Sequence, residues 1–299
     1  MPELPNIVVY IQSLATRIVG QPLQHVRVAS PFLLRTVDPP ISAVEGRRVL
    51  ALRRIGKRIV MELEGDLFIV LHLMIAGRLR WRPVGEKIPA KVGLAAFDFP
   101  QGTLVLTEAA TKKRASLYVV RGEEALPAFD AGGIEVLTAD FDAFRTALLR
   151  ERHTLKRSLT DPRILSGIGN AFSDEILHRA RLSPVQMVDR LTEPQLHQLY
   201  DAIKDVLTEW TRLLSDEVGE GFPEKVTAFH PRMAMHGRYG KPCPDCGTAV
   251  QRIVHASNET NYCPRCQTAG KLLADRSLSR LLHGDWPATI EEMEEKRRQ

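Results

Sequence analysis

The chain has 299 residues, 44% of them hydrophobic, and its 41 Lys and Arg residues against 36 Asp and Glu give a net charge of +5. This length and composition are typical of a soluble protein with two or three globular domains, and the basic balance permits a polyanionic partner. The sequence has no apolar run of membrane-spanning length and no basic-then-apolar signal peptide, which argues against membrane and secreted proteins.

The first six residues, Met1 to Asn6, combine two reactive groups. Removal of Met1 would leave the secondary amine of Pro2 at the terminus, and α-amino groups titrate near pH 8. Attack of this amine on an aldehyde-level carbon would give a cationic iminium, an electron sink suited to elimination. The adjacent carboxylate of Glu3 could act as acid or base. On these residues alone, an ordinary disordered terminus is the commoner explanation.

Hydrophobic periodicity predicts a helix over residues 6–19 that ends at Gly20. Short β-rich runs follow, and their number in one region predicts an antiparallel sandwich. The predicted strands are residues 25–28, 48–50, 58–63, 68–71, 103–107 and 117–120. Residues 121–133, with Pro127 and a Gly132-Gly133 pair, are typical of a linker.

The region after this linker has helical periodicity. Residues 155–177 predict a short helix, a turn and a second helix, and residues 192–195 form a capping box that opens a long helix. The turn contains Gly167-Ile168-Gly169-Asn170. Backbone N–H groups at the start of the second helix would suit a phosphate, although a plain interhelical turn explains the same residues.

All the cysteines lie in one cluster, as two C-x2-C pairs separated by sixteen residues: Cys243, Cys246, Cys263 and Cys266. The spacing predicts a zinc ribbon, with hairpin strands at residues 250–253 and 261–262. The alternative, two disulfides, requires a secreted protein. Four thiolates leave no open coordination position, so we expect one structural Zn²⁺.

In combination these motifs resemble the formamidopyrimidine-DNA glycosylase/endonuclease VIII family of bifunctional DNA glycosylases. The resemblance spans residues 1–266 and rests on five motifs in order: Pro2-Glu3-Leu4-Pro5, Gly56-Lys57-Arg58, His72-Leu73-Met74-Ile75-Ala76-Gly77, the Gly167-to-Asn170 turn and the four-cysteine ribbon. It implies an α+β multidomain fold. We expect a catalytic domain of one helix and an antiparallel β-sandwich at 1–130, a helix–two-turn–helix domain at 131–225, a zinc-ribbon hairpin at 226–270 and an extension at 271–299.

The resemblance also implies a base-excision repair activity. Pro2 would attack C1′ of a damaged nucleotide and form a Schiff base, Glu3 would open the sugar ring as proton donor, and Lys57 would hold a phosphate. β- and δ-elimination would then cut the strand. The implied DNA-binding residues are His72, Ile75, Lys113, Arg114, Lys156, Gly169, Asn170 and Asn258. The expected partner is double-stranded DNA with damaged bases or abasic sites, bound by a monomer in the bacterial cytoplasm.

Several residues depart from the family pattern. Asn6 and Asn258 stand where Glu and Arg are usual, and Asn6 either caps the first helix or alters lesion choice. Residues 107–114 lack the usual Asp-Pro-Arg-Arg of the second wedge loop, and 219–240 is short for a loop that closes over an oxidised purine. Residues 267–299 extend past the family's usual end, with a candidate helix at 272–282 and a mixed-charge solvated tail at 291–299.

Two other functions fit parts of this pattern. One is a lyase-only or noncatalytic protein that binds damaged or abasic DNA. The other is an RNA-binding zinc-ribbon module, which would have no use for a terminal secondary amine beside Glu3 and Lys57. Base choice depends on pocket shape, so the sequence leaves the lesion open.

Overall fold

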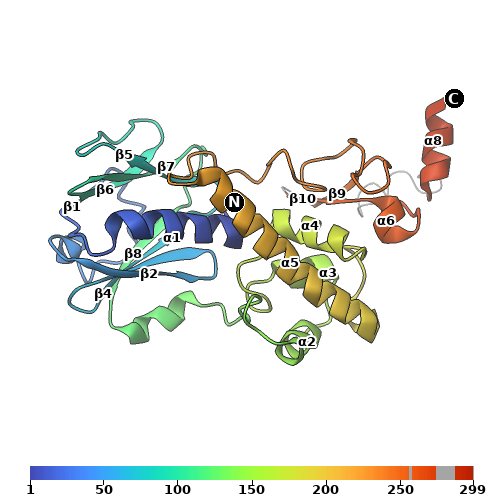
Figure 1. Ribbon diagram of the computed structural model, residues 1–299, viewed down its shortest axis with the longest axis horizontal. Coiled ribbons are helices and arrows are strands. Elements are labelled where there is room, and N and C mark those ends of the chain that lie inside the picture. The colour runs from blue at the N-terminus through green and yellow to red at the C-terminus, as the bar shows by residue number, and fades with distance from the viewer. Residues whose placement is uncertain (256–257, 274–286, 299) are drawn as a thin grey trace. The chain divides into compact units, whose positions relative to one another are not determined.

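The structure, a computed structural model, describes residues 1–255, 258–273 and 287–298 and divides into two compact units (Figure 1). The sandwich unit comprises Met1–Ala131 with Glu209–Thr227. The helical unit comprises Gly132–Thr208 with Ala228–Gln299. The long helix α5 (Glu193–Val218) contributes residues to both units. The predicted boundaries at residues 130, 225 and 270 remain predictions.

Helix α1 (Leu4–Ile18) begins two residues earlier than the periodicity predicted. Its N-cap is Glu3, whose backbone N–H donates to Asn6 Oδ1 at 3.0 Å in a capping box. Asn6 therefore helps to cap the first helix, as one of the two possibilities held, but it does so from the third position of the helix while Glu3 is the N-cap residue. Backbone N–H groups in the first turn of a helix have no acceptor within the helix, so the missing N–H of Pro5 is tolerated there. The opening motif is therefore compatible with this early start.

Two four-stranded antiparallel sheets form the sandwich, with orders β1-β6-β7-β5 and β2-β3-β4-β8. This arrangement confirms the predicted fold. Apolar side chains from both sheets and from α1 share one core. The strands are β1 (His25–Val28), β2 (Val49–Ile55), β3 (Arg58–Leu63), β4 (Leu67–His72), β5 (Gly77–Arg82), β6 (Gly93–Phe99), β7 (Gly102–Glu108) and β8 (Ser116–Arg121).

Strands β5 and β6 had no counterpart among the predicted strands. β5 alternates Arg78, Arg80 and Arg82 with buried or half-buried residues, so its apolar content is too low for a run-based prediction. The predicted linker over 121–133 was also wrong in part, because residues Glu123–Phe129 form the 3-10 helix η2. Leu126 and Phe129 of this helix pack against the outer face of β3 and β4. A second 3-10 helix, η1 (Ile41–Val44), precedes β2.

The helical unit contains the predicted helix–turn–helix as α3 (Leu155–Thr160) and α4 (Asn170–Arg179), preceded by α2 (Phe141–Leu149). A 3-10 helix, η3 (Val188–Arg190), leads to α5, where Thr192 N–H donates to Gln195 Oε1 at 3.0 Å as the capping box predicted. Strands β9 (Gln251–His255) and β10 (Asn258–Tyr262) form the predicted ribbon hairpin, followed by α6 (Pro264–Thr268).

The C-terminal extension contains a helix that the sequence analysis did not predict. Residues 291–299 were predicted to be a mixed-charge solvated tail; Ile290–Arg298 form helix α8, and the described side chains that follow the buried Ile290 are mostly exposed. Leu272 N–H donates to Ala288 O at 2.9 Å, which joins the segment after α6 to the residues before α8. Most of the candidate helix at 272–282 lies outside the described residues. Among the described helices, none is long and apolar enough to cross a membrane.

Candidate active site

Charged groups from three parts of the sandwich unit surround the N-terminal amine. Pro2 and Glu3 at the start of α1 are buried, and Glu3 is only 2% exposed. Burial is the main cause that lowers the pKa of the terminal amine, which in this chain is that of Met1; Glu3 raises it, and Arg78 and Lys57 lower it. A lowered pKa increases the unprotonated, nucleophilic fraction of an amine.

Lys57 lies on the tight turn between β2 and β3. Gly56, before it, has φ +57, a left-handed conformation that a glycine adopts without strain. Burial lowers the pKa of Lys57, and the nearby carboxylate of Glu3 opposes this change. The structure thus brings Lys57 into one electrostatic cluster with Pro2 and Glu3, which lie more than fifty positions earlier in the sequence.

A second tight turn, residues 73–76, presents Ile75 with 54% of its surface exposed. Gly77 closes this turn by donating from its backbone N–H to Leu73 O at 2.9 Å. A Cβ at position 77 would come within 2.2 Å of that same oxygen, so the turn requires glycine. His72 ends β4 just before the turn, and burial, with Arg58 and Lys57, lowers its pKa to about 4. His72 is therefore neutral at cellular pH.

Arg78 follows this turn and was missed by the sequence analysis. Its Nε donates to Val226 O at 2.6 Å and its Nη1 donates to Gly77 O at 2.7 Å. Its charge also reaches the terminal amine. The only sequence signal was its position directly after the His72-to-Gly77 motif, because the alternating arginines of β5 otherwise indicate an exposed strand face.

The buried side chain of Glu108, which is 1% exposed, stabilises the predicted second wedge loop, residues 107–114. Its carboxylate accepts hydrogen bonds from the backbone N–H groups of Arg114 and Ala115, at 2.8 and 3.1 Å. The ammonium of Lys113 donates to the backbone oxygen of Glu108, so this side chain turns back onto its own loop. The side chain of Arg114 is exposed.

In the helical unit, α4 begins at Asn170 with Gly169 as its N-cap. Lys156 donates to Asn170 O and Ser173 Oγ, both at 2.8 Å, and to Asp174 Oδ1. An ammonium has three donors. All three are therefore engaged inside the unit, where Lys156 fixes α3 to the start of α4. A phosphate contact by Lys156 remains a prediction.

Two neighbouring acids of α4 hold the segment that precedes the ribbon, a feature that sequence patterns did not reveal. Asp174 Oδ2 lies 2.8 Å from His236 Nδ1. Glu175 accepts from the backbone N–H groups of Ala234, Met235 and His236 at 2.7 to 2.9 Å. Burial raises the pKa of Glu175, and these backbone donors oppose the change.

The four predicted ligand residues come together at the base of the ribbon, with all Sγ atoms within 4.8 Å of one another. Cys246 and Cys263 are separated by 3.4 Å and Cys243 and Cys266 by 3.9 Å. Tetrahedral zinc with bonds of about 2.3 Å places sulfurs roughly 3.8 Å apart, so the residues fit the metal. They hold one structural Zn²⁺. Asn258 is exposed at the start of β10.

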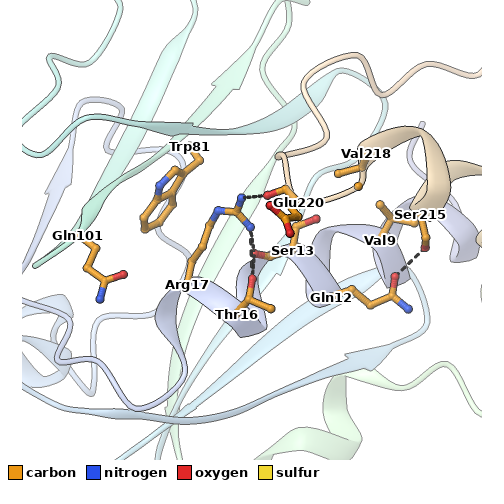
Figure 2. A pocket seen from close by; sticks show the side chains of 11 residues that line it. Val9, Gln12, Ser13, Thr16, Arg17, Trp81, Gln101, Ser215, Val218 and Glu220 are labelled. Atoms are coloured by element: carbon orange, nitrogen blue, oxygen red, sulfur yellow. Dashed lines mark hydrogen bonds between the residues drawn. The ribbon is translucent and has the colours of Figure 1, made fainter.

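A separate cavity of about 630 Å³ opens along the C-terminal half of α1 (Figure 2). Arg17 crosses it and donates to Glu220 O at 2.7 Å and to Gly221 O at 2.9 Å. Trp81 and Gln101 line the other side. None of Pro2, Glu3 and Lys57 lines this cavity, so it is distinct from the charged cluster.

Comparison with known proteins matches the chain to three family models in order. They are the formamidopyrimidine-DNA glycosylase N-terminal domain over residues 1–114, the formamidopyrimidine-DNA glycosylase H2TH domain over 133–217, and the zinc finger found in FPG and IleRS over 240–269. A formamidopyrimidine-DNA glycosylase of Heliobacterium modesticaldum is 34% identical over 280 residues, which cover 89% of this chain and 100% of the relative. The chain belongs to the formamidopyrimidine-DNA glycosylase family.

Other similar proteins agree with this assignment. A formamidopyrimidine-DNA glycosylase of Thermus thermophilus is 34% identical over 281 residues, which cover 90% of this chain and all of the relative. The structure of Lactococcus lactis Fpg with DNA containing an abasic site is 25% identical, with a TM-score of 0.78 over 89% of this chain and 99% of that chain. A complex of the same enzyme with DNA containing an oxidised pyrimidine gives 25% identity, a TM-score of 0.78 and coverages of 89% and 100%. As a member of this glycosylase family, the chain is a DNA glycosylase of base-excision repair with AP lyase activity.

Proposed function

We propose that this glycosylase uses the secondary amine of Pro2, freed by removal of Met1, to excise a damaged base and cleave DNA by β,δ-elimination. The observation that carries the proposal is the buried amine at the start of α1, with Glu3, Lys57 and Arg78 in electrostatic reach. A buried amine with a lowered pKa is nucleophilic near neutral pH.

The chemistry follows from these groups. The amine nitrogen forms a bond to C1′ of the flipped nucleotide as the bond from C1′ to the base breaks, and the base leaves with a proton. Glu3 gives a proton to the sugar ring oxygen, the ring opens, and the C1′–N bond becomes an iminium. The iminium acidifies the C2′ protons, so the 3′ phosphate and then the 5′ phosphate leave by elimination.

The other residues hold DNA in this proposal. Lys57 holds a phosphate beside the sugar, and neutral His72 adds a hydrogen bond. Ile75 fills the gap left by the flipped nucleotide, assisted by the exposed Arg114, while Lys113 holds the loop that carries Arg114 through its bond to Glu108. In the helical unit, Gly169 and Asn170 at the start of α4 and Asn258 of the ribbon contact phosphates, since a helix N-terminus attracts anions. The partner is duplex DNA with damaged bases or abasic sites.

Borohydride trapping tests this mechanism. The protein is incubated with abasic-site DNA and borohydride, and the reduced adduct is digested and located by mass spectrometry. We expect the sugar on the N-terminal Pro2 peptide and a strongly reduced yield for Pro2→Gly, which lacks the secondary amine. An adduct on the Lys57 peptide, or no adduct, would contradict the assignment of Pro2.

A panel of damaged bases in the same duplex then separates the two activities. Release of free base together with strand cleavage identifies a glycosylase, and the bases released define the substrate. Cleavage of abasic sites without release of any base would support the lyase-only alternative. Trapping with abasic RNA provides the control for nucleic-acid class.

A further inference from the structure

We infer that Arg78 is a positioning residue that couples the Ile75 turn and the segment after α5 to the amine nucleophile. The inference rests on the proposed function, and it adds a residue that no motif indicated. Three sets of contacts in the sandwich unit support it.

The first set joins Arg78 to the turn that presents Ile75. The guanidinium donates from Nη1 to Gly77 O at 2.7 Å and to Ile75 O at 3.3 Å. Met74 in the same turn has φ +52, a conformation that is unfavourable for a residue with a side chain. A guanidinium bonded to two carbonyls of this turn therefore stabilises a backbone that would otherwise relax and move Ile75.

The second set joins Arg78 to the segment after α5, residues 219–227. Nε donates to Val226 O at 2.6 Å. Alternate residues of a strand point to the same face of the sheet, so Arg80 and Arg82 lie on the same face of β5 as Arg78 and also reach the segment after α5. Both donate to Glu224, at 3.2 Å from Arg80 and at 2.8 and 3.0 Å from Arg82. Phe222 lies 5.8 Å from the ring of Tyr10, whose hydroxyl accepts from Leu79 N.

The third contact is electrostatic. The charged groups that act on the terminal amine are Glu3, which raises its pKa, and Arg78 and Lys57, which lower it. Burial lowers the pKa of Arg78 itself, yet a guanidinium remains protonated in proteins. Its charge is thus permanent, and together with burial it opposes protonation of the amine at pH values where other neighbours titrate.

The test separates charge from hydrogen bonding by comparing Arg78→Lys and Arg78→Met. Single-turnover trapping on abasic DNA is measured from about pH 5 to 9, a range that extends well below the ordinary titration of an α-amino group near pH 8. Without a positive neighbour the amine pKa rises, so we expect the acid limb for Arg78→Met to move to higher pH. At pH values below the limb, the trapping rate falls about tenfold for each pH unit by which the limb moves. Arg78→Lys retains the charge and leaves the limb in place.

A second readout follows the turn. Fluorescence of 2-aminopurine opposite the abasic site reports insertion of Ile75 into the stack, and it requires no covalent step. We expect both Arg78 variants to reduce this signal several-fold, because lysine lacks the planar fork that binds several carbonyls at once. Arg80→Gln is the matched control: Arg82 still holds Glu224, so both readouts should stay at the wild-type level.

Each outcome decides the inference. Wild-type values of both the acid limb and the fluorescence for Arg78→Met would overturn it, and so would equal losses in Arg80→Gln, which would indicate general loosening of β5. Thermal melting of all variants identifies any unfolded protein, and Arg78→Gln replaces Arg78→Met in that case. If the wild-type protein forms no adduct, the proposed function fails, while the fluorescence comparison still tests the positioning role.

Discussion

The side-chain amide of Asn170 donates from Nδ2 to the backbone oxygen of Glu259 at 2.9 Å, which bonds the first residue of α4 to strand β10 of the zinc ribbon. Both residues belong to the helical unit. One amide donor is therefore engaged inside the unit, and Asn170 stands at the N-terminal end of α4, the end of a helix that attracts anions.

Asn170→Asp should weaken DNA binding about tenfold, because a carboxylate repels phosphate and faces the Glu259 carbonyl without a donor. A negative charge at a helix start gains up to about 1 kcal/mol, so the loss of thermal stability should be small. Fluorescence anisotropy with abasic-analogue DNA measures the affinity. Gln198→Glu, an exposed amide-to-acid change on α5, is the charge-matched control. Equal affinities of the two variants would contradict a DNA-binding role for Asn170.

Removal of zinc should unfold the ribbon while leaving the sandwich unit folded. The cysteines share a small apolar cluster with Met235 and Val250, and all four thiols are free of disulfides. We expect one zinc per chain by atomic emission, its loss in Cys266→Ala, and a lower melting temperature in one of two transitions. Arg265→Ala, exposed on the same helix, should retain both zinc and stability. A Cys266→Ala protein with full zinc content would argue against a four-cysteine site.

Lys57→Arg should extend activity to higher pH. Burial lowers the pKa of Lys57, so its charge is lost at a lower pH than that of an ordinary lysine, and the alkaline limb of the rate profile should reflect this loss. Arginine remains protonated throughout. The profile is measured as single-turnover cleavage of abasic DNA. Lys57→Gln, with no charge at any pH, should be slow across the range; an unchanged alkaline limb in Lys57→Arg would assign that limb to another group.

His72 should make the protein sensitive to acid. Its folded-state pKa of about 4 is below the ordinary 6.5, so the unfolded chain binds more protons between these values. Stability is therefore lost as pH falls from about 6.5, and the loss is complete below about 4. Melting temperatures of the wild type and His72→Gln should converge as the pH falls through this window. Parallel curves would show that His72 does not titrate in this way.

Short-range sequence patterns predicted several features of the structure correctly. The capping box at Thr192 and the paired cysteines depend on residues only a few positions apart, and the structure contains both features. Strand β5 was missed because its polar alternate residues, Arg78, Arg80 and Arg82, are satisfied by Glu224 and Val226, which are more than 140 positions away. No pattern local to the strand contains that information.

The sequence by itself determined the sandwich and the ribbon and predicted a reactive terminus at Pro2, because periodicity, ligand spacing and the chemistry of a terminal residue are local properties. The tertiary structure alone decided the electrostatics of the site. Glu3, Lys57 and Arg78 lie at the start of α1, on the β2–β3 turn and on β5, and only the packing of these elements places their charges around one buried amine. Burial and charge proximity set a pKa, and both are products of the fold.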